Sequence, residues 1–215
     1  MQELDELKII YIDEDIALVE KLPGQDSQSL PELLKAAEGG EGYCVHRLDK
    51  AVGGLLCIAR NSKAAARMSA FLAEGRVDKE YLAVLPSPPS DSNGRLEDLL
   101  FHDKAKNKTF VVKRQRKGVK PAALEYELLE SRDGMALVKV HLITGRSHQI
   151  RVQFASRKLP LLGDVKYGSQ ERRCNISLWA YKLSLPHPSS AEAISMELCP
   201  PESWPWSEFS TLKTQ

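Results

Sequence analysis

The feature that most constrains the fold is a series of short apolar runs separated by tight polar turns. Two short apolar runs in KIIYIDEDIALVEKL (8–22) flank the acidic turn 13–15, and two more runs flank SRDG (131–134). So few residues between strands predict β-hairpins, because a parallel return needs a much longer crossover. Further strands are predicted at 55–60, 77–85, 124–129, 135–142, 177–185 and 194–198. Together with a few helices, they predict an α+β fold on a mixed, largely antiparallel sheet with flanking helices.

Three helices and two irregular regions complete the prediction. Ser29 and Glu32 form a capping-box pattern that opens a short helix ending at Gly39–Gly40. Asn61–Ser62 precedes a second helix that runs to Gly75, and a third should follow Thr144–Gly145. We expect one domain over 1–215 with two lobes, a surface excursion near 86–120, and a Pro/Trp-rich tail lying over the surface from about 200.

Cysteine spacing and segment lengths exclude several classes of protein. The four cysteines show no Cys-x-x-Cys spacing, so we expect neither a disulfide framework nor a zinc site, but free and mostly buried thiols. The longest apolar stretches are too short to span a bilayer, and no signal peptide is evident. No metal-ligand pattern or nucleotide loop stands out. We therefore expect a cytoplasmic monomer without cofactor or metal. The cysteines are Cys44, Cys57, Cys174 and Cys199.

The charges are strongly segregated although the net charge is only +1. Residues 104–120 hold eight Lys and Arg and no acid, whereas residues 1–41 hold eleven acids against three Lys. A second basic cluster comprises Arg146, Arg151, Arg157 and Lys158. Two such clusters are typical of a surface that follows phosphates, although basic runs are often only solvated faces. The charge pattern makes a nucleic acid a candidate partner.

Three segments carry chemically interesting residues. In VHRLDKAVGGLL (45–56), Asp49 lies just before a buried strand, where a carboxylate needs a nearby cation to stay ionised. In LITGRSHQIRVQFA (142–155), arginines crowd a predicted helix start, so we expect an anion there: Asp49, RNA phosphate or both. In VDKEYLAVL (77–85), Tyr81 lies on a predicted half-buried strand, where tyrosines are more often core than catalytic.

Each residue taken singly also has a structural explanation. Asp49 could cap a turn, Arg151 could serve a structural ion pair, and His46 and His148 could be satisfied polar residues near the surface. Two further function classes stay open: a non-catalytic RNA-binding protein, and a hydrolase or nuclease that uses His46, Asp49 and His148, with or without a metal.

Three motifs, taken together and in their order along the chain, favour a functional explanation of these residues. HRLDKAVGGLLCIAR (46–60), KEYLAV (79–84) and TGRSHQIRVQFASRKLPLLGDVKYG (144–168) resemble the signatures of the RluA family of pseudouridine synthases. The resemblance extends from about Ile9 to about Pro188. It departs from the common pattern at Ala51–Val52–Gly53, where many members have an acidic or proline residue followed by Thr-Ser. Larger relatives carry an extra N-terminal S4-like domain, for which we expect no room in this chain.

The resemblance implies a fold, a reaction and roles for the matching residues. We expect the pseudouridine synthase catalytic fold with a central RNA-binding cleft, acting on ribosomal or transfer RNA without a cofactor. Asp49 would be the nucleophile, Arg151 its ion-pair partner and Tyr81 the residue that stacks on the flipped uracil. Arg47 would fill the space that the base vacates. The residues expected to bind RNA are Arg47, His46, Arg146, His148, Lys113, Arg114, Arg116 and Lys117.

Overall fold

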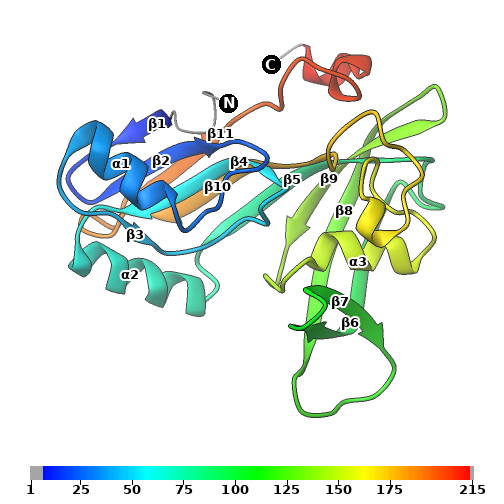
Figure 1. Ribbon diagram of the computed structural model, residues 1–215, viewed down its shortest axis with the longest axis horizontal. Helices are drawn as coiled ribbons and strands as arrows, with labels where there is room; N and C mark the ends of the chain where they lie inside the picture. Colours follow the sequence, from blue (N-terminus) through cyan, green and yellow to red (C-terminus); the bar gives the residue numbers. More distant parts are fainter. Residues whose placement is uncertain (1–6, 214–215) are drawn as a thin grey trace. The chain divides into compact units, whose positions relative to one another are not determined.

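The computed structural model describes residues 7–213, and its contacts divide the chain into two compact units. Unit 1 comprises 1–79 and 179–200, and unit 2 comprises 80–178 and 201–215. A single catalytic domain with a central cleft stays a prediction. In unit 1 the elements are β1 (Lys8–Ile12), β2 (Ile16–Lys21), α1 (Leu30–Glu38), β3 (Tyr43–Cys44), β4 (Gly53–Ala59), α2 (Ser62–Ala73), β10 (Leu178–Pro186) and β11 (Ala193–Glu197) (Figure 1).

Unit 2 holds the long strands and the third helix. Its elements are β5 (Asp78–Leu85), β6 (Asn93–Asp103), β7 (Lys108–Val112), β8 (Val119–Arg132), β9 (Met135–Leu142), α3 (Gln149–Ser156) and the 3-10 helices Val165–Tyr167, Trp206–Glu208 and Ser210–Leu212. The predicted α+β class and largely antiparallel sheet are confirmed. None of the helices in residues 7–213 is long and apolar enough to cross a membrane.

The sheet of unit 1 is mixed and places the Gly-Gly pair against a tryptophan. Its strands run β1-β2-β4-β10; β2 is antiparallel to β1 and β4, whereas β10 is parallel to β4. Gly53 pairs with Trp179, and a Cβ at Gly53 would lie 2.3 Å from the Trp179 ring. Gly54 has a φ of +117°, which disfavours other residues. The glycines therefore let β4 begin close to β10, directly after the segment that carries Asp49.

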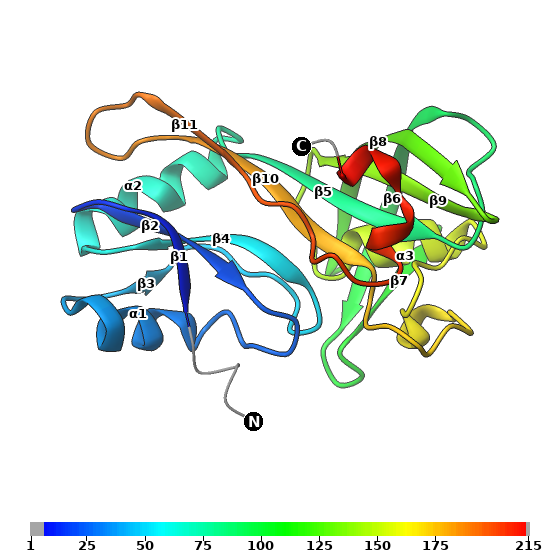
Figure 2. The ribbon, with the colours of Figure 1, turned by 90° about the horizontal axis from the view of Figure 1, so that it is seen from above.

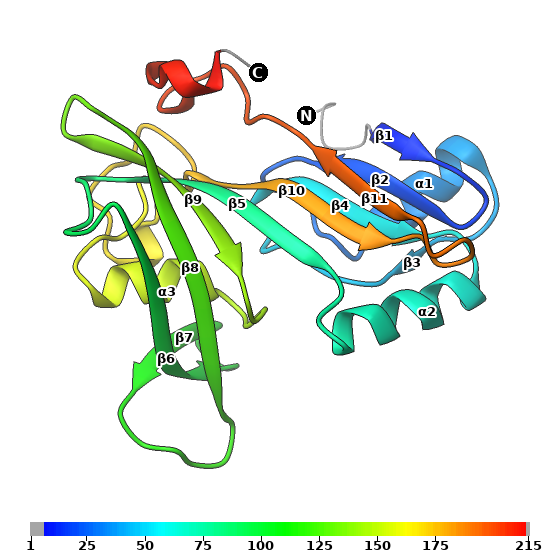
Figure 3. The same cartoon turned by 180° about the vertical axis from the view of Figure 1, so that it is seen from behind.

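Helix α2 covers one face of this sheet (Figure 1 and Figure 3). Asn61 caps it as predicted, because its Oδ1 accepts the backbone N–H of Ala64 at 2.8 Å. Met68 and Phe71 then pack with Leu55 and other buried residues of β2, β4 and β10. This apolar cluster is the core of unit 1.

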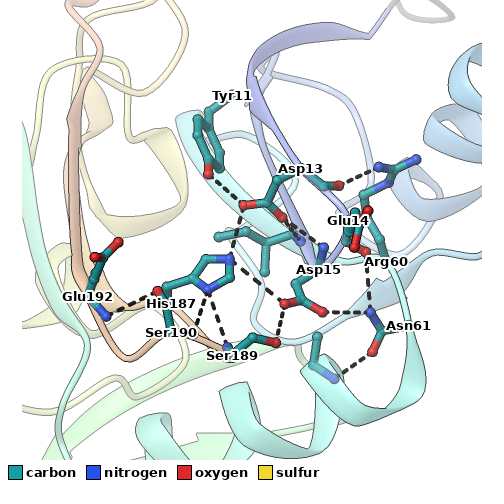
Figure 4. A network of polar contacts seen from close by, with 12 residues as sticks. Tyr11, Asp13, Glu14, Asp15, Arg60, Asn61, His187, Ser189, Ser190 and Glu192 are labelled. Carbon is teal, nitrogen blue, oxygen red and sulfur yellow. Dashed lines mark hydrogen bonds and ion pairs between the residues drawn. The ribbon is translucent and has the colours of Figure 1, made fainter.

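A polar network joins the β1–β2 turn to the β10–β11 turn and to the start of α2 (Figure 4). Asp13 accepts a hydrogen bond from Tyr11 Oη at 2.5 Å and lies 3.0 Å from His187 Nε2. Asp15 accepts from Asn61 Nδ2 at 2.9 Å and from the Ser189 hydroxyl. Hydrogen bonds from Tyr11 and from backbone N–H groups hold the pKa of Asp13 below its ordinary value despite burial. The network fixes three turns of unit 1 to one another.

In unit 2 the strands run β5-β9-β8-β6-β7, and each paired neighbour is antiparallel. Helix α3 lies against β6 and β7 of this sheet (Figure 3). Val152 of α3 packs with Leu100 and Ala122. The rings of Phe154 and Tyr126 meet edge to face, with 5.6 Å between their centres. Strand β7 is the last strand in this order, so one of its edges has no partner strand among the described residues.

The C-terminal residues, which we expect to lie over the surface, are anchored to unit 2 by buried aromatic side chains. Trp206 and Phe209 are buried, and Glu130 of β8 accepts hydrogen bonds from Ser210 and Thr211. Arg132 donates to the backbone carbonyl of Glu208 at 2.9 Å. Figure 2 shows this segment, in red, beside β8. The two aromatic side chains make the tail a packed part of unit 2.

The region 86–120, which we expect to form a surface excursion, contains β6, β7 and the start of β8. Two smaller predictions are wrong. Helix α1 begins at the predicted place, but Ser29 makes no side-chain cap and instead donates to the carbonyl of Asp26. The cysteines are free, yet only Cys57 among them is buried.

Candidate active site and nucleic-acid interface

Asp49 lies on the segment between β3 and β4, in unit 1, and the backbone around it is fixed. Ser27, itself buried, accepts the N–H of Leu48 and donates to the carbonyl of the same residue, both at 3.0 Å. On the other side, the N–H of Val52 donates to the carbonyl of Asp49 at 2.9 Å, which closes a turn. The carboxylate of Asp49 is therefore carried by a rigid segment, and its residue is only partly exposed.

Lys21 holds this segment from inside and was missed by the sequence analysis. It ends β2, is fully buried, and its Nζ donates to the carbonyls of Leu22 at 3.2 Å, Lys50 at 3.1 Å and Val52 at 2.6 Å. Burial lowers the pKa of Lys21 to about 8, and the nearby charge of Asp49 opposes this shift. An ammonium has three N–H donors, so three converging carbonyls satisfy it.

The sequence carried no clear signal for Lys21, because it follows Glu20 at the end of β2 and looks like an ordinary surface charge. At Ala51–Val52–Gly53, where the sequence differs from the common family pattern, Lys21 contacts the backbone carbonyl of Val52. This contact does not depend on which side chain the residue has, and the Val52 side chain itself is buried.

His46 and Arg47 precede Asp49 on the same segment. His46 Nε2 accepts the backbone N–H of Cys57 at 3.0 Å. Burial, with a smaller effect of the charge on Lys79, lowers the pKa of His46 to about 4, so its ring is neutral at pH 7. Its Nε2 lone pair is engaged by the backbone, which weighs against a metal-dependent nuclease using this nitrogen. Arg47 is exposed.

Arg151 lies in the first turn of α3, in unit 2, and forms a bidentate ion pair with Asp164. Arg151 Nε and Nη2 donate to the two carboxylate oxygens at 2.8 and 2.9 Å, and the two side chains are only 5% and 1% exposed. The guanidinium carbon also lies 5.0 Å from the centre of the Tyr167 ring. Asp164 therefore supplies an anion near the helix start, a residue that the sequence analysis did not name although it belongs to the third motif.

Helix α3 begins at Gln149, four residues after Gly145, and the buried Gln149 side chain organises the turn before it. Its Oε1 accepts from Thr144 Oγ1 at 2.8 Å and from the N–H of Arg146 at 3.0 Å. Its Nε2 donates to the carbonyl of Ala123 in β8 at 3.0 Å. Thr144, Arg146 and the start of the helix are thus fixed to the sheet without a side-chain cap from His148.

His148 joins this turn to β7. It has a positive φ of 54°, and its Nδ1 shares a hydrogen bond of 2.9 Å with Tyr167 Oη. The N–H of Thr109, in β7, donates to the same Tyr167 oxygen at 2.8 Å, and Thr109 Oγ1 donates to the carbonyl of Ser147 at 2.7 Å. Burial raises the pKa of Tyr167, so its hydroxyl stays protonated near neutral pH.

The basic segment 104–120 therefore lies beside the start of α3 in unit 2. Arg146 Nε donates to the carbonyl of Pro121 at 3.0 Å, next to the end of the segment. Within residues 7–213, none of the eight Lys and Arg side chains of 104–120 forms an ion pair with an acid. Four predicted RNA-binding residues are exposed in the β7–β8 connection: Lys113, Arg114, Arg116 and Lys117. This surface has positive charge that the described protein does not neutralise.

Tyr81 lies on β5, opposite Val140 of β9, and is 8% exposed. Residues 81–85 are all buried, so this part of β5 is covered on both faces. Asp49 belongs to unit 1, whereas Tyr81 and Arg151 belong to unit 2. The predicted contacts among these three residues stay a prediction.

Comparisons with known proteins agree with the motifs. A family model described as RNA pseudouridylate synthase matches residues 18–156, which include Asp49, Tyr81 and Arg151. An "Uncharacterized RNA pseudouridine synthase" of Aquifex aeolicus is 33% identical over 92% of this chain and 71% of that protein. The "Dual-specificity RNA pseudouridine synthase RluA" of Escherichia coli is 30% identical over 89% of this chain and 92% of its own length.

A solved structure extends the likeness to the fold. The human protein named RNA pseudouridylate synthase domain containing 1 has a TM-score of 0.81 and 26% identity, and the match covers 94% of this chain and 86% of that chain. The resemblance to the RluA family is thereby confirmed. With its three motifs, its α+β fold and a family match over more than half of its length, the chain belongs to the RNA pseudouridylate synthase family, a family of isomerases.

Proposed function

We propose that this protein isomerises a specific uridine to pseudouridine in structured ribosomal or transfer RNA, with Asp49 as the nucleophile. The observation that carries the proposal is the setting of Asp49. It lies within the residues that match the family model, on a segment held by the Ser27 hydroxyl and by the buried ammonium of Lys21. Such an anchored carboxylate can be presented to a substrate with little loss of conformational entropy.

The proposed reaction balances within the substrate. The N1–C1′ bond of uridine breaks, the uracil turns, a C5–C1′ bond forms, and the proton on C5 leaves while N1 gains one. No electrons are gained or lost overall. A bond from the Asp49 carboxylate to C1′ forms as the N1–C1′ bond breaks, and it breaks again when C5 attacks C1′, which returns Asp49 as a carboxylate. One difficult substitution is thereby replaced with two easier steps.

Arg151 and Tyr81 have supporting roles in this proposal. Arg151 pairs with Asp49 and keeps the carboxylate ionised in a partly desolvated site, while Asp164 orients the guanidinium. Tyr81 stacks on the uracil and helps to move the C5 proton. The low exposure of Tyr81 and Arg151 supports roles that need water to be excluded.

The uridine must first leave its stack, which costs a few kcal/mol. Arg47 occupies the vacated space in this proposal, and its exposure two residues before Asp49 supports that role. The basic segment 104–120, with Arg146, His148 and His46, contacts the RNA around the flipped base. Ribosomal and transfer RNA share the phosphate backbone that such a surface recognises. The monomeric state and the cytoplasmic location stay predictions.

The deciding experiment maps pseudouridine in total RNA from cells that contain the wild-type protein, Asp49→Asn, or no protein. Asparagine has nearly the same shape as aspartate but cannot act as an anionic nucleophile. We expect a pseudouridine that depends on the wild type and disappears in Asp49→Asn, with a rate loss on the order of 10³-fold or more in vitro. Activity that survives in Asp49→Asn contradicts the mechanism.

The same samples separate an enzyme from a non-catalytic RNA-binding protein. If the wild type binds RNA but its presence converts no uridine to pseudouridine, the protein is a non-catalytic RNA-binding protein. Equal melting temperatures of wild type and Asp49→Asn provide the folding control, because Asp49 is partly exposed and its backbone contacts remain.

RNA binding by the basic segment has its own test. Reversal of Lys113, Arg114, Arg116 and Lys117 to glutamate should weaken RNA binding and flatten its dependence on salt, because fewer counterions are released. A control variant reverses two exposed basic residues of α2, Lys63 and Arg67, and should change affinity much less. An unchanged salt slope in the first variant shows that the segment does not contact RNA.

A further inference from the structure

Strand β7 presents an aromatic side chain to solvent at the edge of unit 2. Phe110 is 38% exposed, and it is the only aromatic among the large apolar side chains that are exposed in residues 7–213. The residue opposite it on β6 is Phe101, which is partly exposed. Directly opposite residues of an antiparallel pair lie on the same face, so the two rings belong to one face of the β6–β7 hairpin.

Cationic side chains border both rings. Lys108 Nζ lies 5.9 Å from the centre of the Phe110 ring and 5.2 Å from that of Tyr167. The guanidinium carbon of Arg116 lies 4.8 Å from the centre of the Phe101 ring. A single exposed apolar residue is ordinary. A pair of rings on one face, each with a cation beside it, is complementary to a nucleotide, which has a flat base and an anionic phosphate.

The backbone under Phe110 is fixed in place. Thr109 is 1% exposed, and its two hydrogen bonds to Tyr167 and Ser147 hold β7 against the start of α3. Successive side chains of a strand point to opposite faces, so Phe110 points away from the face on which Thr109 is buried. The ring is thus presented by a rigid strand, and base stacking on it costs little ordering of the protein.

We propose that Phe110 is a base-stacking site for an unpaired nucleotide of the RNA substrate, separate from the uridine that reacts. Lys108 and Arg116 contact the phosphates on either side of that nucleotide. This inference rests on the proposed function for its RNA, and it adds a recognition element: the substrate has an unpaired base next to the RNA that the basic segment contacts. Stacking tolerates any base, so the site recognises an unpaired base rather than a sequence.

The test measures binding of two oligoribonucleotide probes, a hairpin with an unpaired loop and a blunt duplex of similar length. Phe110→Ala should weaken hairpin binding roughly tenfold and leave duplex binding nearly unchanged, because stacking on an aromatic residue requires an unpaired base. Phe110→Leu is the matched control: it keeps an apolar side chain without a π face, and we expect it to behave like Phe110→Ala. Phe110→Trp should keep or strengthen hairpin binding.

A second readout does not depend on turnover, and it locates the contact when the hairpin is saturated with protein. Hairpin RNA that carries 5-iodouridine in its loop is irradiated with the wild type, and tryptic peptides are analysed by mass spectrometry. Lys108 and Lys113 define a peptide of residues 109–113, which contains Phe110. We expect a cross-link in this peptide that is lost in Phe110→Leu.

The outcomes separate this proposal from the proposed function. The stacking site is overturned if Phe110→Ala binds the hairpin as tightly as the wild type does and the wild type gives no cross-link in 109–113. This holds even when pseudouridine still forms. An equal loss of poly-glutamate binding in Phe110→Ala assigns the patch to acidic peptides and also overturns it. A wild type that forms no pseudouridine but shows the cross-link contradicts the catalytic proposal alone. Equal melting temperatures exclude misfolding as the cause.

Discussion

The two units each bury a cation beside a predicted active-site element, but they satisfy it in different ways. In unit 1, the ammonium of Lys21 donates to three backbone carbonyls, two of which belong to the segment that follows Asp49. In unit 2, the guanidinium of Arg151 forms a bidentate pair with the carboxylate of Asp164. The first arrangement fixes the path of the backbone, whereas the second fixes the orientation of a side chain.

This difference follows from the geometry of the two cations. An ammonium is a compact charge whose three donors suit carbonyls that converge from several directions. A guanidinium is a planar fork with five donors, and Asp164 uses two of its nitrogens on one side. Arg151 can therefore be oriented by one carboxylate while it serves a second, and the proposed pair with Asp49 uses this property.

The largest expected effect tests the Arg151–Asp164 pair. Asp164→Asn removes the charge of one partner in a buried ion pair and should lower the free energy of unfolding by about 3–5 kcal/mol, measured by urea denaturation. The control is Glu97→Gln, which breaks the exposed pair with Arg95 and should cost less than about 1 kcal/mol. Equal losses in the two variants contradict the structural role of Asp164.

The predicted Asp49–Arg151 pair sharpens this experiment. A double-mutant cycle with Asp49→Asn and Arg151→Met measures the interaction of the two side chains, with the single variants as controls. Residues in contact should give a coupling of about 0.5–3 kcal/mol in the free energy of unfolding. Strict additivity shows that the two groups do not interact in the free protein.

A smaller effect is expected for the ammonium in unit 1. Lys21→Met keeps the length of the side chain but leaves three carbonyls without their donor, which should lower the free energy of unfolding by about 2 kcal/mol. Because two of these carbonyls, those of Lys50 and Val52, follow Asp49 within three residues, pseudouridine formation should fall further than stability accounts for. Lys8→Met, at an exposed pair with Glu20, is the control. A variant that is less stable but fully active assigns Lys21 to stability alone.

The smallest effect concerns the neutral His46 of unit 1. Its pKa of about 4 in the folded protein lies below the ordinary value of 6.5. As pH falls from 6.5 towards 4, the unfolded chain takes up a proton that the folded protein does not, so acid favours unfolding. Above pH 6.5 the residue is neutral in both states and has no effect. His46→Gln can still accept the Cys57 N–H and should remove roughly 1–2 kcal/mol of the stability loss between pH 7 and 5. An unchanged acid limb in this variant contradicts the burial of a neutral ring.

The sequence predicted most of the strands because local pattern specifies them. The DED and SRDG turns and the Asn61 cap act within a few residues, and the structure places them as expected. Strands β6 and β7 were missed, because β6 has only Leu96 and Leu100 fully buried and shows no clean alternation. The packed tail was missed because Trp206 and Phe209 find their partners through tertiary contacts that no local pattern encodes.

In the candidate site, too, local motifs were recognised in the sequence, whereas residues that act through distant partners were not. The motifs identified Asp49, Tyr81 and Arg151 through a resemblance, and the residues alone left a structural role open for each. Lys21 and Asp164 escaped because their importance comes from partners 29 and 13 residues away in the chain. A buried Lys or Asp looks like any surface charge until the fold shows which polar groups surround it.

The pairing of Trp179 with Gly53 has a consequence for the order in which the protein folds during synthesis. A nascent chain that has emerged only through β9 already contains all five strands that the structure describes in unit 2, from β5 to β9. The strands of unit 1 are then still incomplete, because β10 and β11 have not been made. The N-terminal strands are made first, but the Gly53–Gly54 end of β4 must wait for β10, because β3 pairs only with the other end of β4. Long-range closure of this kind slows folding and leaves a temporary aggregation-prone edge, so β4 is the segment that we expect a chaperone to protect.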